Sequence, residues 1–98
     1  FNAYPAEIEN LFLRNEKIAQ VAVVGVPDER MGEVGMAFVV LRPGAEASPD
    51  ELVEWGRAEM ANYKAPRHVE VVDELPLNAM GKVLKYELRE RGTKLVTR

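Results

Sequence analysis

The chain of 98 residues is long enough for one hydrophobic core and too short for two. Apolar residues make up 47% and charged residues 30%, which is the composition of a globular domain and excludes a disordered chain. The net charge of −3 disfavours non-specific nucleic-acid binding, and the absence of cysteine excludes a disulfide scaffold, a thiolate metal site and a thiol nucleophile.

The first predicted element is a helix that begins at Pro5, a residue suited to the first helical position, and ends near Asn15. Its apolar stripe, with helical spacing, consists of Ile8, Leu11 and Phe12. The chain starts at Phe1 without an initiator methionine and enters this helix almost at once. We therefore expect a fragment of a longer protein.

Two strands are predicted next, at residues 18–26 and 34–41, because both stretches are rich in β-branched residues. Pro27 is expected to end the first strand, and Asp28 can turn the backbone with its side chain. The simplest pairing of the two strands is antiparallel. Their apolar runs are far shorter than a membrane span, and the start lacks a signal-peptide pattern, so we expect a cytoplasmic protein with no membrane span.

The strongest local signal is a helix start at residues 48–51. Ser48 can cap the helix, Pro49 suits its first position and Glu51 completes a capping box. This helix is predicted to run to about Asn62. The side chains expected to face the core are Leu52, Trp55 and Ala58.

A short strand at 69–72 and a last helix at 84–91 complete the predicted elements, with Gly92 as the helix end and 93–98 as a frayed tail. Helices and strands in this order predict one α+β domain over residues 1–98. We expect a small, mainly antiparallel sheet of about three strands flanked by helices.

Residues 75–85 form the most informative segment, since Pro76 blocks a regular element and Gly81 frees the backbone just before Lys82. A lysine at the tip of an irregular loop can enter a cleft of another molecule. Lys82 and Lys85 lie three residues apart where a helix resumes and can share a face, which suggests an anionic ligand.

Other catalytic sites have little support. His68 is the only histidine and has no cysteine partner, so no metal site is predicted, and Ser48 is accounted for as a helix cap. No glycine-rich phosphate loop is present. Tyr63 beside Lys64 and Arg67 could stack on a nucleotide and clamp its phosphates. We therefore expect a domain without a complete active site of its own.

Four segments, in order, resemble motifs of the small C-terminal domain of adenylate-forming enzymes, which include acyl-CoA synthetases, carrier-protein adenylation domains and luciferases. Residues 2–9 resemble the segment just after the interdomain hinge, and residues 24–33 resemble the G-x-P-D-x-x-x-G-E loop. Residues 62–66 resemble the Y-K-x-P motif, and residues 75–82 resemble L-P-x-[TN]-x-x-G-K. Four motifs in series are far more specific than any one of them.

The resemblance implies a two-step reaction. A carboxylate attacks the α-phosphate of ATP to give an acyl-adenylate and pyrophosphate, and the thiol of CoA or of a carrier protein then displaces AMP. The small domain would swing between two poses on its own large N-terminal domain, which holds ATP, Mg²⁺ and the acyl group, so this chain alone is expected to be inactive. Lys82 falls on the family's adenylation lysine, with Gly81 and Asn78 in the same ATP loop.

For the second pose, the resemblance places the nucleotide end of CoA near the G-x-P-D and Y-K-x-P motifs. The positions that would meet CoA are Tyr63 at the adenine, Lys64 and Arg67 at the phosphates, and Asn2 and Ala3 near the pantetheine. Ala65 and Met31 differ from the basic and aromatic residues that some relatives carry at these positions.

The chain continues for sixteen residues after Lys82 without a linker to a carrier domain, which favours an acyl-CoA synthetase for a fatty or aromatic acid. The alternatives are a carrier-protein adenylation domain and a non-catalytic module that binds a nucleotide or a partner protein. In relatives, the P-x-x-x-x-G-K context is also a target of lysine acetylation. The resemblance thus adds an acetyltransferase and a deacetylase acting on Lys82 as partners.

Overall fold

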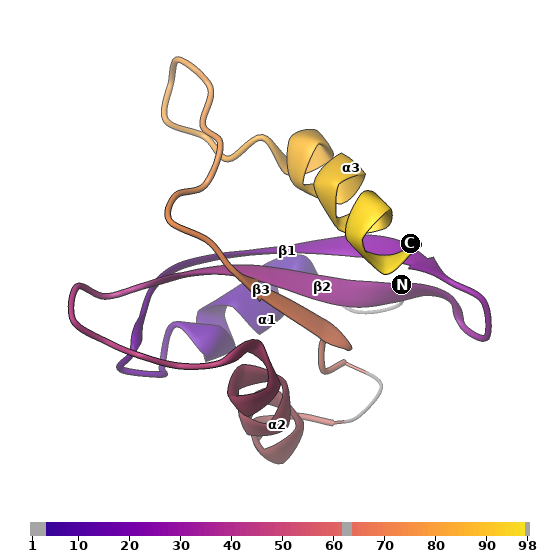
Figure 1. Ribbon diagram of the computed structural model, residues 1–98, viewed down its shortest axis with the longest axis horizontal. Helices are drawn as coiled ribbons and strands as arrows, with labels where there is room; N and C mark the ends of the chain where they lie inside the picture. Colours follow the sequence, from indigo (N-terminus) through magenta and orange to yellow (C-terminus); the bar gives the residue numbers. More distant parts are fainter. Residues whose placement is uncertain (1–3, 62–63, 98) are drawn as a thin grey trace.

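The computed structural model describes residues 4–61 and 64–97. Its elements are α1 (Pro5–Phe12), β1 (Ile18–Asp28), β2 (Gly32–Leu41), α2 (Pro49–Glu59), β3 (His68–Val71) and α3 (Lys85–Val96). The strands form one sheet in the order β1-β2-β3, with α1 and α2 on one face and α3 on the other (Figure 1). The predicted α+β class with a three-stranded sheet is confirmed.

The β1–β2 hairpin is antiparallel, as predicted, and it makes up most of the sheet. Asp28 shapes its turn, because Oδ2 accepts hydrogen bonds from the backbone N–H groups of Arg30 and Met31 at 3.1 and 2.8 Å. The expectation that Pro27 ends the first strand is wrong, since Pro27 lies opposite Glu33 within the ladder. β1 is an edge strand, where the missing N–H of a proline is tolerated.

The third strand pairs parallel to β2, from Met36 opposite His68 to Val39 opposite Val71. Parallel neighbours need a connection that crosses the sheet, and α2 provides it. The ladder is extended at both ends, because the N–H groups of Arg67 and Val72 donate to the carbonyls of Gly35 and Val39. The mixed pairing places the loop that follows β3 on the opposite side of the sheet from α2 (Figure 1).

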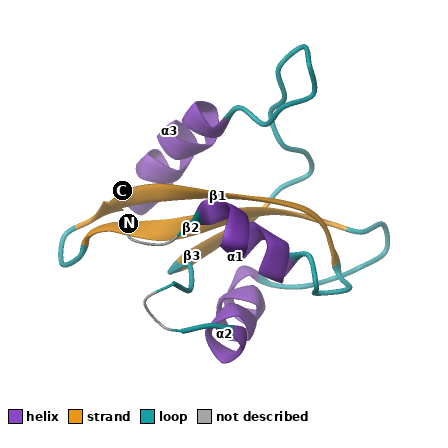
Figure 2. Cartoon of the chain, turned by 180° about the vertical axis from the view of Figure 1, so that it is seen from behind, coloured by secondary structure: helices purple, strands orange, loops and turns teal. Residues whose placement is uncertain are grey.

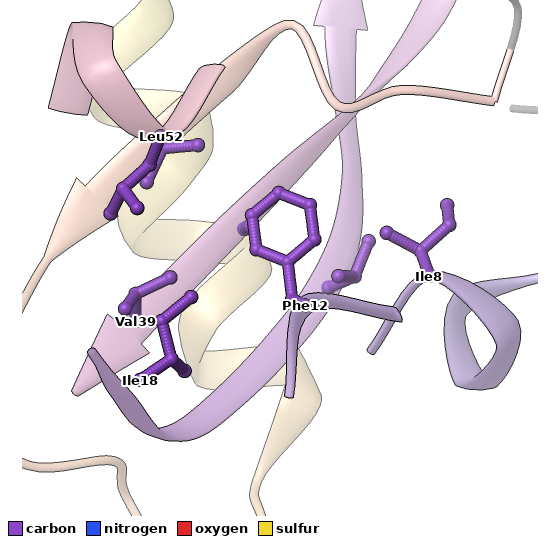
Figure 3. Close-up of a cluster of buried hydrophobic side chains, with 8 residues drawn as sticks. Ile8, Phe12, Ile18, Val39 and Leu52 are labelled. Atoms are coloured by element: carbon purple, nitrogen blue, oxygen red, sulfur yellow. The ribbon is translucent and has the colours of Figure 1, made fainter. Parts of the chain in front are cut away.

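Alternate strand residues point to opposite faces of the sheet and build two buried clusters. On the α1–α2 face, the core consists of Ile8, Phe12, Ile18, Val23, Ala37, Val39, Leu52 and Val69, some of which Figure 3 shows. On the α3 face, it consists of Ala22, Val24, Val26, Val34, Met36, Phe38, Leu75 and Leu88. Because helices cover both faces of the sheet, residues 34–39 of its central strand, β2, are all buried.

The second helix starts where the capping signal predicts. The Oγ of Ser48 accepts the N–H of Glu51 at 3.1 Å, and the Glu51 carboxylate pairs with Lys17 at 2.9 Å, which lowers the pKa of Glu51. Leu52 is buried, and the half-buried Trp55 meets the ring of Phe12 edge-on at 5.5 Å. The inward placement of Ala58 is wrong, because that residue is exposed, one residue before the helix ends. Asn62, its predicted end, lies outside the described residues.

The last helix is longer than predicted. It continues through Gly92 to Val96, so residues 93–96 are helical and were wrongly expected to fray. At Gly92, α3 lies close against the sheet, since a Cβ there would be 2.8 Å from the Sδ of Met36 and 2.9 Å from Val26. This glycine is retained for close packing and not as a helix end. None of the helices in the described residues is both long and apolar enough to cross a membrane.

Candidate functional site

The segment from Val72 to Leu84, between β3 and α3, projects away from the body of the domain and returns to it (Figures 1 and 2). Leu75 anchors its first arm, because this side chain is only 6% exposed and belongs to the core beneath α3. The second arm runs directly into α3 at Lys85. We call this segment the lysine loop, since Lys82 lies near its tip.

The two arms of the lysine loop pair like a very short hairpin. Leu77 and Val83 form an isolated antiparallel bridge, and the N–H of Leu84 donates to the carbonyl of Pro76 at 2.9 Å. Nearer the tip, the N–H of Asn78 donates to the carbonyl of Lys82 at 2.8 Å. Backbone hydrogen bonds therefore join the two arms, and they extend to the exposed tip beyond Val83, which packs against the core beneath α3.

The tip contains the three residues that the sequence motif groups together. Gly81 has a φ of +83°, a conformation that residues with a Cβ rarely adopt. This turn lets the chain reverse between Asn78 and Lys82. The Oδ1 of Asn78 accepts hydrogen bonds from the N–H groups of Met80 and Lys82, both at 2.9 Å. Lys82 is therefore presented by a turn whose backbone is hydrogen-bonded on both sides.

The side chain of Lys82 is exposed, and it makes no ion pair with any residue in 4–61 or 64–97. An amine buried in the core or neutralised by a neighbouring acid could not serve an external anion. The ammonium of Lys82 is under neither constraint within the described part of the chain. The exposed ammonium of Lys82 is therefore accessible to an anion of another molecule.

Lys85 has a different environment, although it lies only three residues further on. Its Nζ contacts Glu9 Oε2 at 2.6 Å and donates to the carbonyl of Val23 at 3.0 Å. The same Glu9 oxygen accepts the N–H of Val23 at 2.8 Å. The hypothesis that Lys82 and Lys85 share a helical face is wrong, because Lys82 precedes the helix and Lys85 joins α3 to α1 and β1.

A second candidate region is a shallow hollow beside the β1–β2 turn. Its lining residues are Pro27, Asp28, Glu29, Arg30, Arg67, His68, Val96 and Thr97. The turn thus lines the same hollow as Arg67 and His68, which follow the Y-K-x-P segment. Arg30 and Arg67 both line this hollow, and in the described residues neither makes an ion pair. Arg30 was not predicted from the sequence as a site residue. Its position within the G-x-P-D-x-x-x-G-E loop was the feature that could have indicated it.

Of the other residues predicted to meet CoA, the structure describes only Lys64, which does not line this hollow. Lys64 pairs with Glu7 at 3.0 Å and lines a separate groove between α1 and the end of α2. Tyr63, Asn2 and Ala3 lie outside the described residues. His68 is half-buried at the start of β3. Within 4–61 and 64–97, no three histidine or acidic side chains lie close enough to hold a metal ion.

This fold and these motifs coincide with those of known proteins. The model of the AMP-binding enzyme C-terminal domain family matches residues 7–82. The chain is 53% identical over 90 residues to the 3-(7a-methyl-1,5-dioxo-octahydro-1H-inden-4-yl)propanoyl:CoA ligase of Rhodococcus jostii, covering 92% of this chain and 18% of that protein. It is 46% identical over 90 residues to the fatty acid–acyl-carrier-protein ligase ScoC of Streptomyces coeruleorubidus, covering 92% and 17%.

Among solved structures, ATP-bound MatB from Rhodopseudomonas palustris superimposes with a TM-score of 0.89 at 37% identity, over 97% of this chain and 19% of that one. The chain belongs to the family of C-terminal domains of AMP-binding, adenylate-forming enzymes. It spans less than a fifth of the length of the curated relatives it matches.

We predict that Lys85→Met lowers the free energy of unfolding by about 0.5–1 kcal/mol, because it removes one partly exposed ion pair and one hydrogen bond while keeping the apolar stem. Urea unfolding of the 98-residue chain measures this change. Lys82→Met is the matched control and should change stability by less than ~0.5 kcal/mol. Equal losses in the two variants would show that the contacts of Lys85 carry no stability.

Proposed function

We propose that this chain is the mobile C-terminal domain of an AMP-forming acyl-CoA ligase, and that Lys82 supplies positive charge for the adenylation step. The observation that carries the proposal is an exposed lysine near the tip of a projecting loop that backbone hydrogen bonds hold together. The sequence around it resembles the motif that contains the family's adenylation lysine. The larger domain, which makes up most of the relatives' length, would hold ATP, Mg²⁺ and the acyl group.

In the first step, an oxygen of the acyl carboxylate attacks the α-phosphorus of ATP. The bond from that phosphorus to the bridging oxygen breaks, so that pyrophosphate leaves and an acyl-adenylate forms. Two anions must approach each other, and the ammonium of Lys82 can lie between the carboxylate and the α-phosphate. A lysine suits this place because its charge is compact and its donors rotate freely.

In the second step, the sulfur of CoA attacks the acyl carbonyl carbon and the thiol proton is released. The bond from that carbon to the phosphate oxygen of the mixed anhydride breaks, and AMP leaves with its electron pair. We propose that the domain reorients for this step and that Arg67, with Arg30 in the same hollow, faces the phosphates of CoA. Lys64 would take a lesser part, since its amine already pairs with Glu7. Contacts from Tyr63, Asn2 and Ala3 remain predictions.

The proposed substrate is a fatty or aromatic carboxylic acid. Its support is the likeness to ligases of a ring-substituted propanoate and of fatty acids. A carrier-protein thiol is the second candidate acceptor, favoured by the likeness to ScoC. Because ATP and CoA would be its substrates, we place the protein in the cytoplasm.

We expect Lys82→Ala in the full-length protein to slow acyl-adenylate formation by roughly 100- to 1000-fold, or ~2.7–4 kcal/mol, because one preorganised charge is lost at the transition state. Thioester formation from supplied acyl-adenylate should keep its rate. Pyrophosphate exchange measures the first step and a thiol assay the second. Lys94→Ala, an exposed lysine on α3, is the control. Equal losses in both steps would contradict the role of Lys82.

Arg67→Ala should raise the KM for CoA about five- to tenfold and leave adenylation unchanged, because one charge-assisted contact to phosphate is lost. Arg57→Ala is the matched control, since Arg57 is exposed on α2, away from the hollow, and pairs with Glu54. Steady-state kinetics with purified acyl-adenylate checks this effect. An unchanged KM for CoA, or faster transfer to a carrier protein than to CoA, would contradict the proposed acceptor site.

We also propose that acetylation of Lys82 switches the enzyme off, because the acetyl amide carries no charge to place between the two anions. The exposed position of Lys82 leaves it open to an acetyltransferase and a deacetylase. Mass spectrometry of the full-length protein from its own cells should find acetyl-Lys82 in a fraction with slow adenylation. Deacetylation should restore that step. Complete absence of acetyl-Lys82 under all growth conditions would contradict this regulation.

A further inference from the structure

We infer that Asn78 is the positioning residue of the adenylation lysine, holding the backbone of Lys82 in place through its side-chain carbonyl. This inference rests on the proposed function of Lys82 and extends it to a residue that acts through the backbone of Lys82. We call the hydrogen bonds that Asn78 makes with Met80, Gly81 and Lys82 the clamp, because they hold the tip of the lysine loop.

The clamp is built from hydrogen bonds that all involve Asn78. Its Oδ1 accepts from the N–H of Met80 and from the N–H of Lys82, each at 2.9 Å. Its backbone N–H donates to the carbonyl of Lys82 at 2.8 Å, and its carbonyl accepts the N–H of Gly81 at 3.0 Å. Lys82 is therefore bonded to Asn78 through both its own N–H and its own carbonyl.

The chemistry of the donors defines which end of the Asn78 amide faces the turn. Both partners of the side chain are N–H groups, so only the amide oxygen can satisfy them. With two N–H groups bound, this oxygen has used both of its lone pairs and has none left for a substrate donor. The oxygen of the Asn78 side chain therefore acts on Lys82 by holding the backbone of the turn.

The tip needs such a clamp because packing cannot order it. Residues 77–82 are all exposed, and Met80 is 91% exposed, so the core contributes nothing to their conformation. Gly81, at a φ of +83°, adds the residue type with the largest backbone freedom. The hydrogen bonds to Asn78 therefore stabilise the observed conformation of the tip over the other conformations that its backbone can adopt.

The root of the loop is fixed independently of the clamp. Leu75 is buried, Leu77 bridges to Val83, and Lys85 is bound to Glu9 and Val23. A fixed root and a clamped tip together make the loop a short, stiff arm. On such an arm, the ammonium of Lys82 is held near the position that adenylation requires. A loose tip would lose conformational entropy in each reaction to reach that position.

Asn78→Leu tests the clamp, because leucine is of similar size and offers no acceptor. In the full-length protein, hydrogen–deuterium exchange over milliseconds to seconds, read by mass spectrometry on peptides covering 77–84, should speed up about tenfold at the tip. Ala79→Leu is the matched control for exchange, since it adds the same apolar group one residue away and breaks no side-chain hydrogen bond. Asn78→Thr, whose hydroxyl can accept in the same way more weakly, should restore part of the protection.

In the same Asn78→Leu protein, kcat for adenylation should fall about tenfold, while the KM values for ATP and the acid change less than twofold. Thioester formation from supplied acyl-adenylate should be unaffected. Asn78→Thr should recover part of the lost kcat. A purely structural role would instead lower both half-reactions together with the unfolding midpoint.

The outcomes separate this inference from the proposed function. Faster exchange at the tip together with slower adenylation supports the clamp. Unchanged exchange, or faster exchange with normal adenylation, overturns it, and the proposed role of Lys82 then stands if Lys82→Ala still loses the first step. Normal adenylation in Lys82→Ala overturns both.

Discussion

The lysine loop projects from the domain, and its placement depends on the attachment of both its ends to a rigid body. The fixed points are the buried side chain of Leu75 and the contacts of Lys85 with Glu9 and Val23. These contacts tie the loop to the sheet, to α1 and to α3 at once. The sheet, with helices on both faces, is the rigid body to which the loop is attached.

The two lysines of the loop show how environment divides roles between identical side chains. Lys85 is held by an ion pair and a backbone carbonyl, so its charge is used inside the domain. Lys82, three residues earlier, has no such partner in the described residues and remains available to an external anion. If both ammonium groups were paired inside the domain, neither could meet an external anion. If neither were paired, the second arm of the loop would lose its contacts with Glu9 and Val23.

Local signals in the sequence predicted the elements whose causes are local. Ser48 and Pro49 marked the start of α2, and Asp28 marked the hairpin turn, because each acts within three residues of itself. The errors fall where distant contacts decide. Gly92 is typical of a helix end, yet α3 continues past it to Val96. A glycine fits there because a Cβ would meet Met36 and Val26 of the sheet. Likewise, Pro27 stays in β1 because that strand lies at the edge.

The sequence by itself determined the family, the α+β class and the grouping of Asn78, Gly81 and Lys82, since motif order and turn chemistry are written along the chain. Only the tertiary structure decided that β3 runs parallel to β2, that Lys85 is bound to Glu9, and that Arg30 shares a hollow with Arg67. Each of these joins residues more than thirty positions apart. Such contacts depend on which surfaces the packed core brings together, and no local pattern records that.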